Sequence, residues 1–545
     1  MVKRQEEMKV LHELNKERHG DRAGNYLAAM VDNRLKSLDY VLYNPHQVEF
    51  IDYLHPDGRR TYVRSLSFLL QKAVREVFPT AQLRISYSVG NALYCDLVFP
   101  DNREETTEDL EKLTAAMLRM VEKNIPFRQE KIPTENAKKI FSDNGFPQKA
   151  LLQKTRGHFF TSVYYLGDTA DTFYGPLVPS AGYLTLFNLC LFHKGFLLQY
   201  PHPDDPQRLD GPPRLHRLVE IFEEHVQWGN IMGVKDIGTL NQKIQQGLTK
   251  DLILTTEAFH SRRYAEIADK IYRHRDRLKL VLIAGPSSSG KTTTSKRVAT
   301  QLKVLGLKPV VLEMDNYFLD RENTPRDENG EYNFETIHAL DVPFLNHQLT
   351  DLLAGKEVEI PYFDFFTGKR SFRGKKIKLG ESQILIMEGI HALNPALTED
   401  VPSGVKFKIY ASALTSLSMD ENNGISTTDT RMVRRMVRDA QFRGVTAEET
   451  ILRWPSISVG ERKNIFPFQE QADVMFNSAL LYELAVLKTH AEPLLHRILP
   501  ISPAYPQALR LLKFLSYFTP IFPKEEKYIP YESVIREFIG TSRQD

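Results

Sequence analysis

One stretch of this chain is compatible with very few folds. Residues 278–302, LKLVLIAGPSSSGKTTTSKRVATQL, run from an apolar strand-like segment through a glycine-rich turn into a helical pattern. The turn, Gly285 to Thr292, fits G-x-x-x-x-G-K-[ST], a loop whose backbone N–H groups surround phosphate oxygens at the positive end of the following helix. Because a strand precedes the motif and a helix follows it, we predict a phosphate-binding loop.

Individual loop residues have predicted roles. The Lys291 ammonium can reach the β- and γ-phosphates of a nucleotide, and the Thr292 hydroxyl can ligate Mg²⁺. The remaining predicted phosphate contacts are Gly285, Ser287, Ser288, Ser289, Gly290 and Thr293. The loop by itself does not separate kinases from GTPases, motor ATPases or transporter subunits.

Four short apolar segments alternate with helical patterns and predict a parallel sheet covered by helices. They span 278–285, 308–315, 382–389 and 405–412. The second segment ends at Asp315, which could accept a proton from an attacking hydroxyl or could simply cap a turn. The third carries Glu388, which suits a Mg²⁺-bound water, the alternative being a pair with a nearby base.

Arginines recur through residues 429–444, DTRMVRRMVRDAQFRG. Those at 431, 434, 435 and 438 follow the i, i+3, i+4, i+7 spacing and therefore share one helix face. Guanidinium groups suit bidentate phosphate binding, so the pattern predicts a mobile helix that closes over ATP. A solvated charged face is the alternative.

Six blocks of the second half together resemble the uridine kinase and phosphoribulokinase family over roughly residues 278–500. They are GPSSSGKTTTS, MDNYF, YNFETIHALD, IPYFDFFTGKR, ILIMEGI and DTRMVRRMVRD, in that order. The resemblance implies ATP- and Mg²⁺-dependent phosphorylation of a sugar hydroxyl, typically the 5′-hydroxyl of uridine or cytidine.

The resemblance also implies roles for single residues. Asp315 matches the catalytic base, and Lys291 with the arginines neutralises charge that develops during transfer. The other carried-over residues are Glu335 at the sugar, Phe363 near the base, Arg435 at the nucleoside, and Arg438 and Arg443 at the phosphates. Gly368 stands where pyrimidine nucleoside kinases place a base-reading histidine, which weakens the expectation for uridine.

The front half resembles the N-terminal region of threonyl-tRNA synthetases over about residues 20–225, through VRSLSFLLQKAVREVF, DLEKLTAAMLRMVEKNIPF and FYGPLVPSAG. That region is a small ubiquitin-like domain of the TGS type followed by an editing-type domain. The metal- or ester-handling pairs of the editing site fall on Arg64, Phe68, Phe173 and Leu177. Since three of the four are large and apolar, we expect a scaffold without editing chemistry.

Composition excludes little else. Lys and Arg total 71 against 69 Asp and Glu in 545 residues, so no global charge draws the protein to nucleic acid or membrane. Two cysteines argue against a disulfide framework. The N-terminus lacks a secretory h-region, and residues 183–200 predict a buried strand pair. We expect a cytoplasmic homo-oligomer without membrane contact.

These observations predict an α/β P-loop kinase domain preceded by α+β TGS-like and threonyl-tRNA synthetase editing-like domains. The expected parts are a TGS-like domain (1–58), an editing-like domain (59–230), a linker and helix (231–277), the kinase domain (278–500), and a C-terminal helix and tail (501–545). Two other functions stay open. One is a kinase for another small alcohol or sugar phosphate, and the other is an ATP-switched RNA-binding regulator whose front half contacts RNA, with Arg59, Arg60 and Arg64 near Tyr62 as a small basic cluster.

Overall fold

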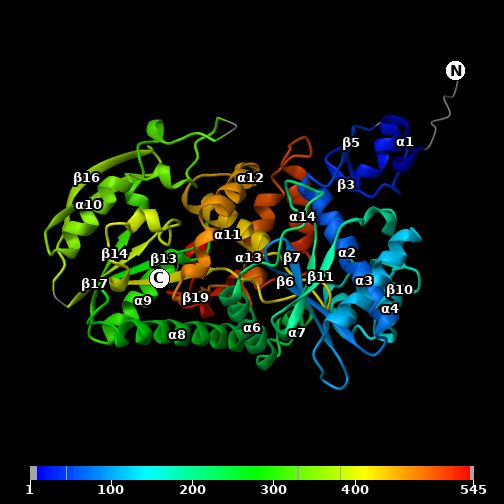
Figure 1. Cartoon of the computed structure of the whole chain (residues 1–545), viewed down its shortest axis with the longest axis horizontal. Coiled ribbons are helices and arrows are strands. Elements are labelled where there is room, and N and C mark those ends of the chain that lie inside the picture. Colours follow the sequence, from blue (N-terminus) through cyan, green and yellow to red (C-terminus); the bar gives the residue numbers. More distant parts are fainter. Residues whose placement is uncertain (1–8, 44–45, 328–329, 381, 541–545) are drawn as a thin grey trace.

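The computed structural model describes residues 9–43, 46–327, 330–380 and 382–540. Figure 1 shows the front half on one side of the molecule and the phosphate-loop domain on the other. Helix α14 (Tyr505–Leu515) lies between them, beside α2 (Pro56–Val77), and the long helix α8 (Thr249–Arg273) runs along the edge of the phosphate-loop domain.

The first part of the chain is a small α+β module. Helix α1 (Leu11–His19) packs its buried Leu11 with Ala29, Val31 and Leu38. The strands are β1 (Lys9–Val10) paired with β4 (Val41–Leu42), and a sheet in the order β3 (Arg34–Lys36), β2 (Ala28–Val31), β5 (Val48–Ile51).

Two antiparallel sheets and four helices follow. The predicted buried strand pair at 183–200 is confirmed as β11 (Asn188–Phe192) and β12 (Gly195–Gln199). Its sheet has the order β11-β12-β7-β6, and the other has the order β10-β9-β8. The remaining elements are α2, β6 (Gln82–Ser88), β7 (Ala92–Val98), α3 (Thr107–Glu122), β8 (Phe127–Pro133), α4 (Thr134–Asp143), α5 (Pro147–Arg156), β9 (Phe160–Leu166) and β10 (Thr169–Asp171).

A five-stranded parallel sheet forms the centre of the second half, as predicted. Its order is β14-β17-β13-β18-β19, with the phosphate-loop strand β13 in the middle. The four predicted segments correspond to β13 (Leu280–Ala284), β14 (Lys308–Glu313), β17 (Gln383–Glu388) and β18 (Lys406–Ser412), and the fifth strand is β19 (Val474–Asn477).

Helices cover both faces of this sheet. Apolar side chains of α8 and α9 (Lys291–Val304) pack on one face with Val281, Ile283 and Ile386. The opposite face packs against α10 (Val342–Leu353) and α6 (His216–Ile231), with Leu282 and Met387 buried between them. The other elements are α7 (Ile237–Gln245), the hairpin β15 (Val358–Asp364) and β16 (Lys369–Ile377), α11 (Thr427–Phe442), α12 (Ala447–Asn464), α13 (Glu483–Leu495) and α15 (Arg536–Ile539).

The loop between β18 and α11 joins the two halves. Ile85 N donates to Glu421 O at 3.1 Å, and Asn422 Nδ2 donates to Leu83 O at 2.8 Å. Fully buried Lys149 of α5 contacts Asp171 at 2.7 Å and Asp420 at 2.9 Å. The loop that leads into the arginine-rich helix is therefore held by the synthetase-like half.

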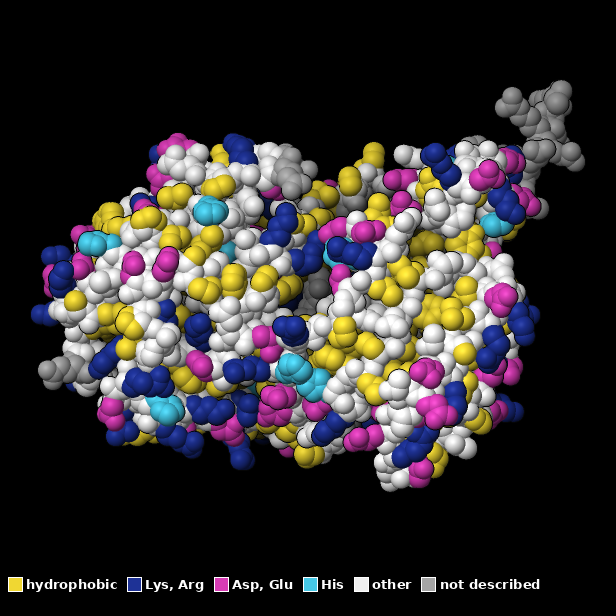
Figure 2. Space-filling view, in the orientation of Figure 1, with side chains coloured by type: hydrophobic (Ala, Val, Ile, Leu, Met, Phe, Trp, Pro, Cys, Tyr) yellow, Lys and Arg dark blue, Asp and Glu magenta, His cyan; other side chains and the backbone are white. Residues whose placement is uncertain are grey.

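Within the described ranges, no helix is both long and apolar enough to cross a membrane. On the face drawn in Figure 2, acidic and basic side chains are interspersed over both halves. That mixture agrees with the near balance of charge in the whole sequence.

Candidate functional site

The glycine-rich loop folds tightly between β13 and α9. Ser288 and Gly290 have positive φ angles of 59° and 78°, which turn successive N–H groups inward. A Cβ on Gly285 would lie 1.9 Å from Ala411 O, so only glycine fits beside β18. The local sequence thus builds the predicted phosphate cradle.

Several polar groups of the loop have no partner within the described part of the chain. The Ser288 and Ser289 hydroxyl oxygens are buried and unpartnered, although buried polar groups are normally hydrogen-bonded. Lys291 Nζ donates to Pro286 O at 3.1 Å. Burial lowers the pKa of Lys291, while Glu388 and Asp315 oppose that shift. Unmatched hydroxyl groups beside a half-buried lysine fit an anionic ligand.

The two predicted acids lie together at the carboxyl edge of the sheet. Glu313, the last residue of β14, is level with Glu388 of β17, and Asp315 follows two residues later. Thr292 Oγ1 donates to Glu388 Oε1 at 2.6 Å. Burial raises the pKa of Glu388 to about 7, with Asp315 adding to the shift and Lys291 opposing it. The pairing of a hydroxyl and a carboxylate beside the loop suits a divalent cation.

Glu335 is half-buried and packs against Gly460 of α12. Its Oε2 atom has no hydrogen-bond partner among the described residues, and a Cβ on Gly460 would lie 2.3 Å from its own Cβ. Burial and the negative charge of Glu461 raise the pKa of Glu335 to about 7, against the pull of Arg435. An unpartnered buried carboxyl of this kind needs a ligand hydroxyl or cation.

The hairpin β15–β16 supplies an aromatic wall. Phe363 is buried, and its ring lies 5.6 Å from that of Phe318 and 5.2 Å from that of Phe365. Gly368 turns the hairpin with φ 70°, and Arg321 occupies the space where its side chain would begin, 2.7 Å from an added Cβ. Arg321 therefore fills the space beside Gly368 that a side chain at this position would need.

Three predicted arginines lie along the loop-facing side of α11 and just beyond its end. Arg435 Nη1 donates to Ser287 Oγ at 2.7 Å. Arg438 contacts Asp439 at 2.8 Å, but its Nη2 atom is buried without a partner among the described residues. Arg443 lies 3.7 Å from Asp439 and 5.3 Å from the centre of the Phe365 ring. These guanidinium groups bring positive charge toward the loop.

The other two arginines of the predicted stripe have protein carboxylates as partners. Buried Arg431 pairs with Glu461 and also donates to Ser287 O at 3.0 Å. Fully buried Arg434 pairs with Glu483 and donates to Ser478 O at 2.8 Å. Burial without a partner would be costly for either charge, so the stripe is partly a structural brace for the loop.

Two carboxylates that contact the loop were not predicted from the sequence. Glu461 Oε1 accepts a hydrogen bond from Ser287 N at 3.2 Å. Glu537, from the expected C-terminal tail, accepts from Thr293 N at 3.3 Å and Thr293 Oγ1 at 2.7 Å. No local pattern predicts either contact, because 174 residues separate Ser287 from Glu461 and 244 separate Thr293 from Glu537.

In the front half, the four positions that match the editing site lie close together. Phe68 lies 5.5 Å from Phe173 between ring centres, and both are buried in one apolar cluster with Leu177. Arg64 Nη2 donates to Pro176 O at 2.9 Å. Among the described residues, no group of three or more His, Cys, Asp or Glu side chains could hold a metal.

The side chains of the small basic cluster near Tyr62 bind other groups of the front half. Arg59 donates to Pro203 O at 2.9 Å, and Arg60 pairs with Asp57 at 2.7 Å. Tyr62 donates to Leu186 O at 2.9 Å and is buried. These side chains therefore brace the front half, and contact with RNA stays a prediction.

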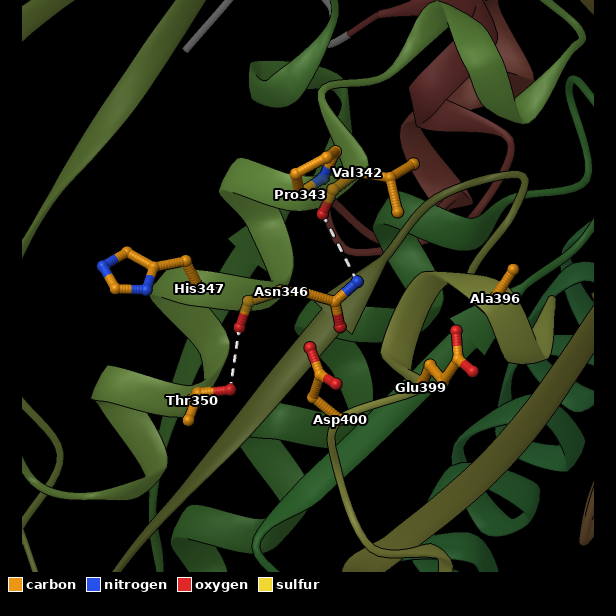
Figure 3. Close-up of a pocket in the computed structure, with 8 residues that line it drawn as sticks. All are labelled: Val342, Pro343, Asn346, His347, Thr350, Ala396, Glu399 and Asp400. Atoms are coloured by element: carbon orange, nitrogen blue, oxygen red, sulfur yellow. Dashed lines mark hydrogen bonds between the residues drawn. The ribbon is translucent and has the colours of Figure 1, made fainter.

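A surface depression of about 500 Å³ lies away from the loop, between α10 and the segment after β17. In Figure 3 the carboxylate of Asp400 points toward Asn346 of α10, whose Nδ2 atom donates to Val342 O at 3.3 Å. Its lining is Val342, Pro343, Asn346, His347, Thr350, Ala396, Glu399 and Asp400. The residues predicted for the site lie elsewhere.

Comparison with known proteins covers both halves. A model of the Phosphoribulokinase / Uridine kinase family matches residues 280–482. The uridine kinase of Deinococcus deserti is 30% identical over 172 residues, which is 32% of this chain and 73% of that protein. The uridine kinase of Staphylococcus epidermidis is 30% identical over 197 residues, covering 36% of this chain and 86% of that protein.

The N-terminal region matches threonine–tRNA ligases. That of Symbiobacterium thermophilum is 32% identical over 164 residues, covering 30% of this chain and 25% of the ligase. The chain therefore spans about a quarter of the length of these ligases. A solved structure described as a possible uridine kinase from Bacillus stearothermophilus is 22% identical, covers 37% of this chain and 89% of that chain, and has a TM-score of 0.25.

Proposed function

Because the chain belongs to the phosphoribulokinase and uridine kinase family, we propose that it is an ATP-dependent nucleoside kinase that phosphorylates the 5′-hydroxyl of uridine, cytidine or a related nucleoside. The observation that carries this proposal is the meeting of Asp315, Glu388 and Thr292 beside Lys291 of the phosphate loop. A base, a metal-binding pair and a phosphate-binding lysine then share one site.

The chain's own residues fit ATP and Mg²⁺. The unpartnered Ser288 and Ser289 hydroxyls and the spare Arg438 donor would hold phosphate oxygens. Thr292 and Glu388 would hold Mg²⁺, which supplies positive charge against phosphate oxygens when bound. Gly285, Ser287, Gly290, Thr293 and Arg443 complete the proposed nucleotide contacts.

Asp315 orients the acceptor hydroxyl and takes its proton as the oxygen attacks the γ-phosphorus and the bond from that phosphorus to the bridging oxygen breaks, so that ADP leaves. Lys291 and the arginines stabilise the negative charge that grows on the transferred group. Glu335 accepts hydrogen bonds from sugar hydroxyls, Phe363 packs near the base, and Arg435 lies between Ser287 and the acceptor. Because Gly368 has no side chain to read a base and Arg321 fills the space beside it, phosphoryl transfer is better supported than a pyrimidine acceptor.

The test is ATP-to-ADP conversion by the full chain against a panel of nucleosides, sugar phosphates and other small alcohols, with and without Mg²⁺. We expect Mg²⁺-dependent turnover with a nucleoside, and the product's phosphate at the 5′-position by NMR. Turnover only with a sugar phosphate would replace the nucleoside assignment. Bound ATP with no turnover on the whole panel would contradict the proposal.

The raised pKa of Glu335 gives a pH prediction. A carboxyl with a pKa of about 7 is charged above pH 7 and neutral below it. Hydrogen bonds to a charged acceptor are stronger, so the KM for the acceptor should rise about tenfold from pH 8 to pH 6, with a smaller change in kcat. Steady-state kinetics with saturating ATP measures both constants.

Glu335→Gln is the matched control, because it keeps the shape and removes the titration. Its acceptor KM should be high and nearly constant across the same range. An equal pH dependence in both proteins would assign the effect to another group.

A further inference from the structure

The C-terminal segment closes on the phosphate loop. Val534, Ile535 and Phe538 are buried in the core that includes α11. A Cβ on Gly290 would lie 2.5 Å from Val534 Cγ2, so segment and loop are in direct contact. Arg434 lies 4.9 Å from the centre of the Phe538 ring. The segment lies beyond the family match at 280–482.

Glu537 places a carboxylate at the start of α9. Thr293, third residue of that helix, gives it both its N–H, at 3.3 Å, and its hydroxyl, at 2.7 Å. The first N–H groups of a helix have no partner inside the helix and bind anions. Thr293 is also one of the residues proposed for nucleotide contact.

Glu461, the other carboxylate at the loop that was not predicted, differs from Glu537 in its ion pairing. Glu461 is paired with Arg431, so it has a basic partner within the protein. Among the ion pairs of the described residues, Glu537 has no partner, and its carboxylate instead contributes to the field at Lys291. An unpaired carboxylate at the loop repels nucleotide phosphates as well as holding the donors they need.

We propose that Glu537 is an internal competitor of the nucleotide, which must release its carboxylate from Thr293 before ATP phosphates bind there. The residue thereby sets the ATP concentration at which the enzyme works. This inference rests on the proposed ATP binding, and it assigns to the C-terminal segment a direct role in nucleotide affinity.

The test is calorimetric binding of a non-hydrolysable ATP analogue, with Mg²⁺, to the full chain and to Glu537→Gln and Glu537→Ala. We expect the Kd to fall about tenfold in the alanine variant, since a charge-assisted hydrogen bond and a repulsive charge are both removed. The glutamine variant, which loses the charge and can still accept from Thr293, should fall between. The KM for ATP should fall with the Kd.

Two controls make the result specific. Glu532→Gln, on the same segment but paired with Arg297 at 3.2 Å, should leave the Kd unchanged. Adenosine, which has no phosphates, should bind all four proteins equally. A Kd for the analogue that is unchanged or raised in both Glu537 variants overturns the inference, as does an equal change for adenosine.

Calorimetric unfolding of each variant shows whether it keeps the wild-type fold, and the glutamine variant preserves the test if alanine loosens the segment. Absence of analogue binding by every protein would overturn both this inference and the proposed function. Tight binding of the analogue with the same Kd in the wild type and in both Glu537 variants would overturn this inference alone.

Discussion

We expect the Asp315→Asn variant to lose phosphoryl transfer by a factor of about 10²–10⁴, with its ATP affinity within about threefold of the wild type. Asparagine keeps the size of the side chain but cannot take the proton of the acceptor hydroxyl. Asp315 lies close enough to Lys291, Glu388 and Arg443 to act on their pKa values. Asp315 therefore lies among the residues proposed to contact the nucleotide and the metal ion.

The measurement is single-turnover ADP formation together with calorimetric ATP binding. Glu322→Gln, an exposed change on the nearby surface, serves as a matched control and should retain full activity. Wild-type turnover by Asp315→Asn would remove Asp315 from the role of base. A loss of ATP binding as large as the loss of turnover would assign it to nucleotide contact instead.

The second large effect concerns stability. Lys149→Met should lower the free energy of unfolding by about 3–5 kcal/mol, because it leaves Asp171 and Asp420 buried without a counter-charge. Burial alone would lower the pKa of Lys149, but the two carboxylates together raise it above its ordinary value. The lysine is therefore charged and essential to both partners.

Chemical unfolding followed by fluorescence and by circular dichroism measures this change. Lys154→Met replaces an exposed lysine on the same helix, α5, and should change stability little. If Lys149→Met unfolds at the same denaturant concentration as Lys154→Met, the buried contacts of Lys149 with Asp171 and Asp420 contribute nothing to stability.

Features encoded by neighbouring residues could be predicted from the sequence. The loop, the four strands and the meeting of Thr292 with Glu388 follow from apolar runs and from the parallel order of strands. The fifth strand, β19, has only four residues, and so short an apolar run fits a strand or a helix equally well. The editing positions converge in space, as the resemblance to synthetases implies.

Features that depend on distant partners could not be predicted. The spacing of Arg431 and Arg434 on one helix face predicted phosphate ligands. Their carboxylate partners, Glu461 and Glu483, lie 30 and 49 residues further along the chain. Glu537 sits in a segment that looked like a tail, and nothing near it in sequence points to Thr293. The space filled by Arg321 beside Gly368 likewise comes from a separate segment. Each of these contacts joins residues far apart in the sequence, so no local pattern predicts it.

The loop between β18 and α11 packs against residues that precede residue 278, where the predicted kinase domain begins. Leu417, Met419 and Ile425 of that loop share an apolar core with Leu152 of α5 and Ile237 of α7. A fragment that began at residue 278 would uncover those side chains and leave Asp420 without Lys149. The front half thus supplies part of the apolar core and the counter-charge on which the loop before α11 depends.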